Sequence, residues 1–130
     1  MRVNVLVDSC GWIEYFTNGT LADKYQPYII NATKHTHFTP TIVLYEVYKL
    51  VKREFDEKLA LEACARIKAY TTTVPIDEEL ALAAADLGTK YRLSMADAMI
   101  IASAERHSAR VVTSDEHLGK LKGVELIQQR

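Results

Sequence analysis

The stretch Val3–Phe16, with the sequence VNVLVDSCGWIEYF, joins a short apolar run to a helical pattern through a single aspartate. Residues 3–7 are rich in β-branched side chains and predict a short buried strand. Ser9 is a suitable N-cap for a helix that continues to Phe16. Asp8 stands between the two, where a turn or helix start accepts an acid but a buried charge needs compensation. Other acids in similar positions would indicate a shared site.

The remainder of the chain alternates strand patterns with single helices or helix pairs. Strands are predicted at 37–39, 72–76, 110–113 and 124–127, and helices at 20–32, 41–55, 56–70, 77–91 and 94–107. Thr20 is the predicted N-cap of the first of these helices. Because such alternation is typical of parallel sheets covered on both faces, the sequence predicts an α/β protein. Its expected architecture is a three-layer α/β/α sandwich with a mainly parallel central sheet.

Composition narrows the class of protein. The 130 residues fit one domain spanning 1–130, and 48% hydrophobic residues suffice for a buried core. The net charge of −1 is not that of a general nucleic-acid binder, so a polyanionic partner would need a local basic patch or bound cations. The first residues lack the long apolar core and small-residue cleavage site of a signal peptide, and no apolar run approaches the ~18 residues of a membrane span. We therefore expect a soluble, cytoplasmic protein with no membrane partner.

Cys10 and Cys64 stand in no paired motif and are expected to be ordinary buried side chains.

Two acids follow predicted strands. Asp8 ends the first strand, and Asp115 follows the strand at 110–113. Ligands of parallel α/β sheets bind at the carboxyl ends of the strands, so both carboxylates are expected at one edge of the sheet. Taken alone, Asp115 fits a solvated loop residue better than a site residue.

Two further acids lie on the apolar faces of predicted helices. At about 100° per residue, Glu46 falls within the stripe that contains Val43 and Val47. An unpaired charge on such a face is costly or becomes protonated. Asp97 also lies on an apolar face, although together with Ser94 it fits a capping box that serves the helix N-terminus.

Four carboxylates at one edge would repel one another unless protons or cations were present. All-oxygen ligation suits hard divalent cations such as Mg²⁺ or Mn²⁺. A polyanionic substrate would also require positive side chains. The basic residues that lie near the acid-bearing segments in the sequence are Lys49, Lys52, Arg53, Lys58, Arg106, Arg110, Lys120 and Lys122.

Taken together, these motifs resemble the PIN-domain nuclease family, and specifically its VapC-type toxins. The matching segments, in order, are VLVDSCGWIE (5–14), YEV (45–47), SMADA (94–98) with IIA (100–102), and VTSD (112–115). Each segment is weak alone. The ordered set is fairly specific, and it covers nearly the whole chain.

The resemblance implies a metal-dependent endoribonuclease that hydrolyses RNA phosphodiester bonds. Motif position implies four residues that are both catalytic and metal-binding: Asp8, Glu46, Asp97 and Asp115. They would hold one or two Mg²⁺ or Mn²⁺ ions. Ser9 and Thr113 match positions where the family places small supporting hydroxyls near the metal site.

The resemblance also implies partners. VapC-type proteins usually form homodimers and bind a small cognate antitoxin that plugs the active site, so RNA, an antitoxin and a second copy of the chain are all expected. Trp12 and Tyr15 on the first helix belong either to the core or to such an interface, where aromatic residues are enriched.

Other interpretations predict different residues. A PIN nuclease of RNA processing would carry the same four acids, whereas a catalytically silent RNA-binding PIN module would normally have lost them. A receiver domain would require a phospho-acceptor aspartate after a mid-chain strand, which this sequence lacks. A phosphatase with an aspartate nucleophile usually has a second aspartate two residues later, where Cys10 stands here.

Overall fold

The computed structural model describes residues 3–129, and two groups of parallel strands make up its sheet. β1 (Asn4–Val7), β4 (Ala109–Thr113) and β5 (Val124–Leu126) form one group in the order β1-β4-β5, and β2 (Phe38–Pro40) pairs with β3 (Thr72–Val74). A parallel bridge between Val5 and His37 joins the groups, and the Val5 N–H donates to the Thr36 carbonyl at 2.7 Å. The spatial order is therefore β3-β2-β1-β4-β5.

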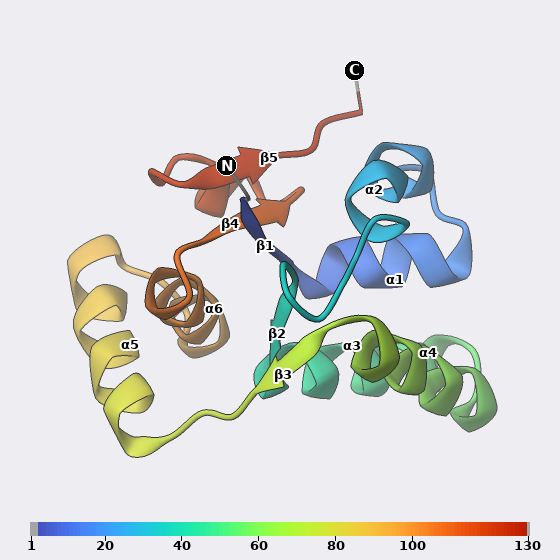
Figure 1. The fold of residues 1–130 in the computed structure, drawn as a ribbon, viewed down its shortest axis with the longest axis horizontal. Helices are drawn as coiled ribbons and strands as arrows, with labels where there is room; N and C mark the ends of the chain where they lie inside the picture. Colours follow the sequence, from blue (N-terminus) through green and yellow to red (C-terminus); the bar gives the residue numbers. More distant parts are fainter. Residues whose placement is uncertain (1–2, 130) are drawn as a thin grey trace.

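Helices cover both faces of this sheet. They are α1 (Ser9–Thr17), α2 (Ala22–Ile29), α3 (Thr41–Glu54), α4 (Glu57–Tyr70), α5 (Glu78–Tyr91), α6 (Met95–Arg106) and the short α7 (Glu116–Gly119). Figure 1 shows α5 and α6 on one side of the strands and α1 to α4 on the other. The predicted three-layer α/β/α sandwich with a parallel sheet is confirmed. No helix within residues 3–129 has the length and apolar character needed to cross a membrane.

The hydrophobic core lies between the central strands and these helices. Leu6 of β1 and Val112 of β4 expose none of their surface. The predicted apolar stripe on α3 is buried, including Val43 and Val47. Trp12 is also buried and packs within the core. The strands that carry the acids are thus held on both faces.

The predicted helices and strands agree with the structure to within a few residues, but two predicted caps are wrong. Asp8, and not Ser9, is the N-cap of α1, because its side chain accepts the Ser9 backbone N–H. Thr20 does not cap α2, which has Leu21 at its N-cap position and no side-chain cap. The Leu21 N–H is instead bound by a carboxylate oxygen of Glu14 at 3.2 Å.

Two other features differ from the sequence prediction. The helix α7 was not predicted, because four residues are too few to show a helical period. Cys10 and Cys64 are only partly buried. Cys10 in particular lies among polar side chains at the edge of the sheet.

The strand order creates a crevice between β1 and β4. From β1 the chain continues to β2 and β3 on one side, and it later returns to β4 and β5 on the other. In open parallel sheets, such a reversal leaves a crevice at the carboxyl ends of the two central strands, where ligands bind. Asp8 follows β1 and Asp115 follows shortly after β4, so both border this crevice.

Gly11 on α1 provides a test of how tightly α1 packs on α2. An added Cβ would lie 2.5 Å from Tyr25 Cε1 and 2.7 Å from Val7 Cγ1. Gly11→Ala is therefore expected to lower the free energy of unfolding by about 1–3 kcal/mol. Gly88→Ala on α5 is the control, because its Cβ would meet the nearest atom at 3.5 Å. That change is expected to be neutral or to stabilise by up to about 1 kcal/mol. Urea denaturation measures both, and equal effects would contradict the packing described.

Candidate active site

Asp8 is a nearly buried carboxylate at the crevice between β1 and β4. Only 5% of its surface is exposed. Its Oδ1 accepts the Ser9 backbone N–H at 2.7 Å, and its Oδ2 accepts the Thr113 hydroxyl at 2.8 Å. Burial raises the pKa of Asp8 above its ordinary value, and these hydrogen bonds oppose the shift. No lysine or arginine of the described residues forms an ion pair with it, so its charge lacks a positive partner.

Asp115 is tied to Asp8 through the same hydroxyl. The Asp115 backbone N–H donates to Thr113 Oγ1 at 3.0 Å. Its side chain caps α7 by accepting the His117 N–H at 2.8 Å. The charge of Asp115 also contributes to the raised pKa of Asp8, although burial is the larger cause. A single threonine therefore orients both acids at the ends of β1 and β4.

Glu46 reaches the crevice from α3, which begins directly at the carboxyl end of β2. Burial raises the pKa of Glu46, a hydrogen bond with Ser9 opposes the shift, and the charges of Asp8 and Asp97 add to it. Its Oε1 is buried and has no hydrogen-bond partner within the described part of the chain. The predicted position of Glu46 on an inward helix face thus corresponds to a partly buried carboxylate with one buried, unsatisfied oxygen.

Asp97 lies in the first turn of α6. Its backbone N–H donates to the Ser94 hydroxyl at 3.2 Å, so the predicted cap is present. Burial raises the pKa of Asp97, and the charges of Asp8 and Asp115 raise it further, while Ser94 and His117 oppose the shift. Asp97 therefore takes part both in the helix cap and in the electrostatics of the crevice.

The structure brings all four predicted acids to one edge of the sheet. Within residues 3–129, no three His, Cys, Asp or Glu side chains already have the arrangement of a metal site. The donor set nevertheless fits a hard divalent cation, because it offers only carboxylate oxygens and one of them, on Glu46, is buried without a partner. A cation would also relieve the mutual repulsion of the carboxylates, which adds to the effect of burial in raising the pKa values of Asp8, Glu46 and Asp97.

A thiol and two hydroxyls beside Asp8 were not predicted as part of the site. Cys10 Sγ lies 3.7 Å from Asp8 Oδ2, 3.5 Å from Thr113 Oγ1 and 3.3 Å from Tyr25 Oη. Ser114 Oγ donates to the same sulfur at 3.4 Å. Burial raises the pKa of Tyr25, which therefore stays a neutral phenol. The position of Cys10, two residues after Asp8, was a usable signal, but the contact with Tyr25 depends on how α2 packs.

Positive charge near the acids comes from α3. Glu46, Lys49 and Arg53 line a pocket of about 230 Å³ together with Tyr45 and Leu50. Lys49 Nζ lies 5.5 Å from the centroid of the Tyr45 ring, and no ion pair in residues 3–129 involves it. Arg53 is engaged with the neighbouring Glu54 at 3.0 Å. Lys49 therefore lies beside Glu46 without an acidic partner in the described residues and can meet an anion there.

Two other basic residues lie far from the crevice. Arg106 is at the opposite end of α6 from Asp97 and binds Asp77 at 3.0 Å. Arg110 is near the amino end of β4, away from the carboxyl ends where the acids lie, and forms an ion pair with Glu125 at 2.9 Å. The structure does not bring these two predicted contacts together with the acids.

Comparison with known proteins identifies the family. The family model described as PIN domain matches residues 5–124, which is most of the chain. The chain belongs to the PIN domain family. The match runs from β1 to the first residue of β5 and includes all four acids, so the predicted resemblance is confirmed. No curated protein sequence matches this PIN domain significantly.

Several solved structures share the fold. A chain of a toxin–antitoxin complex from Klebsiella pneumoniae gives a TM-score of 0.77 at 21% identity, covering 96% of this PIN domain and 98% of that chain. VapC20 of Mycobacterium tuberculosis, a toxin that cleaves the sarcin–ricin loop, gives 0.76 at 16% identity and covers 94% and 99%. VapBC2 of Rickettsia felis, bound to a DNA fragment from its promoter, gives 0.75 at 13% identity and covers 97% and 100%. These similarities confirm the fold predicted from the VapC-type motifs.

The raised carboxyl pKa values predict how stability depends on pH. The folded-state pKa of Asp8 lies above the unfolded value, so its ionisation costs stability at neutral pH. This cost disappears as the pH falls towards the ordinary carboxyl value of about 4. Burial lowers the pKa of His37, which acts in the opposite direction near its own ordinary value. The difference between wild type and Asp8→Asn therefore isolates the carboxylate.

In EDTA, Asp8→Asn is expected to exceed wild type in unfolding free energy by on the order of 1 kcal/mol at about pH 7.5. The gap should narrow at about pH 5, where more of the Asp8 population is protonated. Urea denaturation at the two pH values measures this. A gap of the same size at both, or a less stable variant at neutral pH, would contradict the assigned electrostatics.

Proposed function

We propose that this PIN domain is an endoribonuclease that hydrolyses RNA phosphodiester bonds and requires Mg²⁺ or Mn²⁺. The main support is one observation, the group of four interacting acids at the β1–β4 crevice, including the unpartnered Oε1 of Glu46. Such a group has no evident structural benefit, because burial and the neighbouring acids raise the pKa values of Asp8, Glu46 and Asp97, and none of the four forms an ion pair with a lysine or arginine of residues 3–129. In cation-assisted hydrolysis of a phosphodiester, each of the four acids has a role.

The acids divide into two proposed roles. Asp8, Asp97 and Asp115 provide the direct or water-mediated ligands for one or two cations. When bound, such a cation neutralises charge on the scissile phosphate and lowers the pKa of water. Glu46 orients the attacking water or contributes a ligand through it. Its raised pKa, caused mainly by burial, also suits it to accept a proton from that water.

The neighbouring hydroxyls position these acids. Thr113 donates to the Asp8 carboxylate and accepts from the backbone N–H of Asp115, so one hydroxyl links the segments that carry the two acids. Ser9 interacts with Glu46 and donates its own backbone N–H to Asp8. Both hydroxyls therefore support the geometry of the acids and do not themselves attack the phosphate.

The reaction adds water across one P–O bond. The water oxygen bonds to phosphorus as the P–O3′ bond breaks, and the departing 3′ oxygen ends as a hydroxyl. The products are a 5′-phosphate on one fragment and a 3′-hydroxyl on the other. A product with a 2′,3′-cyclic phosphate would contradict this mechanism, because it requires attack by the RNA's own 2′-hydroxyl.

We also propose that the protein is the toxin of a toxin–antitoxin pair, with a small antitoxin as partner and a homodimer as its own assembly. Similar structures that align along nearly their full length include a toxin–antitoxin complex and VapBC2, which supports this role. The surface also offers apolar side chains for a protein partner. Leu82 on α5 is 71% exposed and Met95 on α6 is 72% exposed.

Cleavage is the direct test of the nuclease. Partner-free protein is expected to cut some members of a panel of structured RNAs with Mn²⁺ or Mg²⁺ and none with EDTA. Asp8→Asn should lower the rate by roughly 100-fold or more, the scale of losing a charged group that acts on the transition state. Asp86→Asn, which changes an exposed acid on α5, should keep wild-type activity. Cutting that persists in Asp8→Asn would overturn the site. Absence of cutting by folded wild type would favour the RNA-binding module.

Cation binding is measurable without a substrate. Mn²⁺ should raise the melting temperature of wild type, since a ligand at 100 times its Kd adds about 2.7 kcal/mol of stability. Asp8→Asn should lose most of that increase, and Asp86→Asn should retain it. Differential scanning fluorimetry with and without EDTA gives the comparison. An equal increase in all three proteins would place the cation outside the crevice.

A further inference from the structure

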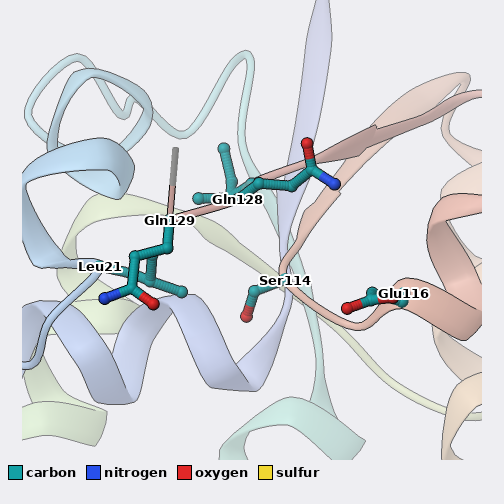
Figure 2. A pocket seen from close by; sticks show the side chains of 6 residues that line it. Leu21, Ser114, Glu116, Gln128 and Gln129 are labelled. Atoms are coloured by element: carbon teal, nitrogen blue, oxygen red, sulfur yellow. The ribbon is translucent and has the colours of Figure 1, made fainter.

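A larger pocket opens beside the acids. Its volume is about 640 Å³, within the range of small-molecule sites. Figure 2 shows Leu21 and Gln129 towards one side of the pocket, Glu116 towards the other, and Ser114 between them. The residues that line it are Leu21, Ser114, Glu116, Ile127, Gln128 and Gln129. They come from the loop before α2, the segment that follows β4 and the segment that follows β5.

The pocket adjoins the catalytic crevice. Ser114 and Glu116 flank Asp115 in the sequence, and Ser114 Oγ lies 3.4 Å from Cys10 Sγ. That sulfur is 3.7 Å from Asp8 Oδ2. Two short contacts thus connect the wall of the pocket with the central acid, so a group bound in the pocket would belong to a nucleotide near the scissile phosphate.

The wall formed by the C-terminal segment is held in place. The Ile127 N–H donates to the Thr113 carbonyl at 2.7 Å, which continues the pairing between β4 and β5. The Lys24 ammonium donates to the carbonyl of Gln128. These bonds hold the backbone at Ile127 and Gln128, so less ordering of this wall is required when a ligand binds.

The lining favours an uncharged ring with polar edges. Glu116 is the one charged residue among the lining residues, and no lysine, arginine or histidine of the described chain is among them. A phosphate group is therefore disfavoured. Leu21 and Ile127 provide apolar contacts, while Gln128 and Gln129 each offer amide donors and an acceptor. A nucleobase combines these features, with an apolar face and hydrogen-bonding edges.

We propose that this pocket binds an unpaired base adjacent to the cleaved bond and prefers an amino-bearing base over uracil. The inference rests on the proposed ribonuclease function. Sequence-specific RNA recognition commonly reads bases that are splayed out of single-stranded loops. The Glu116 carboxylate accepts hydrogen bonds from the amino groups of cytosine, adenine or guanine. Uracil instead places a carbonyl oxygen on each side of its single N–H, and both oxygens repel a carboxylate.

The test uses hairpin RNAs with randomised loops, cut with Mn²⁺, and the sequences around the cut sites are read from the products. Wild type should show one position near the cut where amino-bearing bases exceed uracil. Glu116→Gln introduces an amide that can donate to a uracil carbonyl, so it should reduce this preference by roughly fivefold or more at that position. Gln128→Ala should weaken the same preference. Glu62→Gln, an exposed acid on α4, is the matched control and should leave it unchanged.

The outcomes separate the pocket from the nuclease. Cutting by wild type with no preference against uracil, or with a preference that both pocket variants retain, overturns the base pocket and leaves the nuclease intact. The same result is expected if the pocket binds a segment of a protein partner instead of a base. If wild type cuts no RNA, the proposed function fails. Titration with nucleosides then tests whether the pocket binds a base. Larger NMR shifts of the Gln128 and Gln129 amides with cytidine or adenosine than with uridine, reduced in Glu116→Gln, would support it. Absence of shifts would overturn it.

Discussion

The hydrogen bond from the Thr113 hydroxyl to Asp8 connects the carboxyl ends of the two central strands, and the other acids are arranged around it. It gives a nearly buried carboxylate one of its few neutral partners. The same hydroxyl accepts the backbone N–H of Asp115 and so sets the start of the loop that leads to α7. Glu46 and Asp97 then approach from α3 and α6, and their pKa values respond to the charge of Asp8. The parallel pairing of β1 and β4 is what brings these groups within reach of one another.

The crevice differs from the rest of the protein interior in the polarity of its buried groups. Elsewhere, most buried side chains are apolar, as in Leu6 and Val112 of the sheet, and buried hydroxyls such as those of Thr39 and Thr71 pair with each other. At the crevice, burial brings like charges together and leaves an oxygen of Glu46 unsatisfied. Such local conflicts are expected at functional sites, where the surrounding fold supplies the stability that the site does not. The charge pattern therefore carries more functional information than the fold, which other PIN domains share.

Local patterns drew attention to the acids, but they did not define a site. Asp8 and Asp115 followed predicted strands and Glu46 interrupted an apolar helical stripe, whereas Asp97 also fitted a helix cap, and only the resemblance to the PIN family assigned the four to one catalytic set. Caps were harder, because the choice between Asp8 and Ser9 depends on side-chain direction at a sharp strand-to-helix turn.

Tertiary contacts explain what the sequence could not show. The Leu21 N–H is satisfied by Glu14 from the preceding helix, so Thr20 is not needed as a cap. The contact between Cys10 and Tyr25 requires α1 and α2 to pack together. Arg110 was predicted near the acids because it is close to Asp115 in the sequence. It lies near the amino end of β4, however, whereas the acids lie at the carboxyl ends of the strands. The pocket beside Ser114 combines three distant segments, and no linear motif describes it.

The two central strands, β1 and β4, lie far apart in the sequence, and this has a consequence for biosynthesis. Asp8 directly follows β1, the first strand to be made, whereas Thr113 follows 105 residues later, and pairings of such long range form late and slowly. A ribosome that has released only β1 to α6 has exposed three of the four acids without the strand that aligns them. The nascent chain therefore has no assembled crevice, and the activity proposed for it would be absent beside the RNA that encodes it until β4 and β5 have emerged.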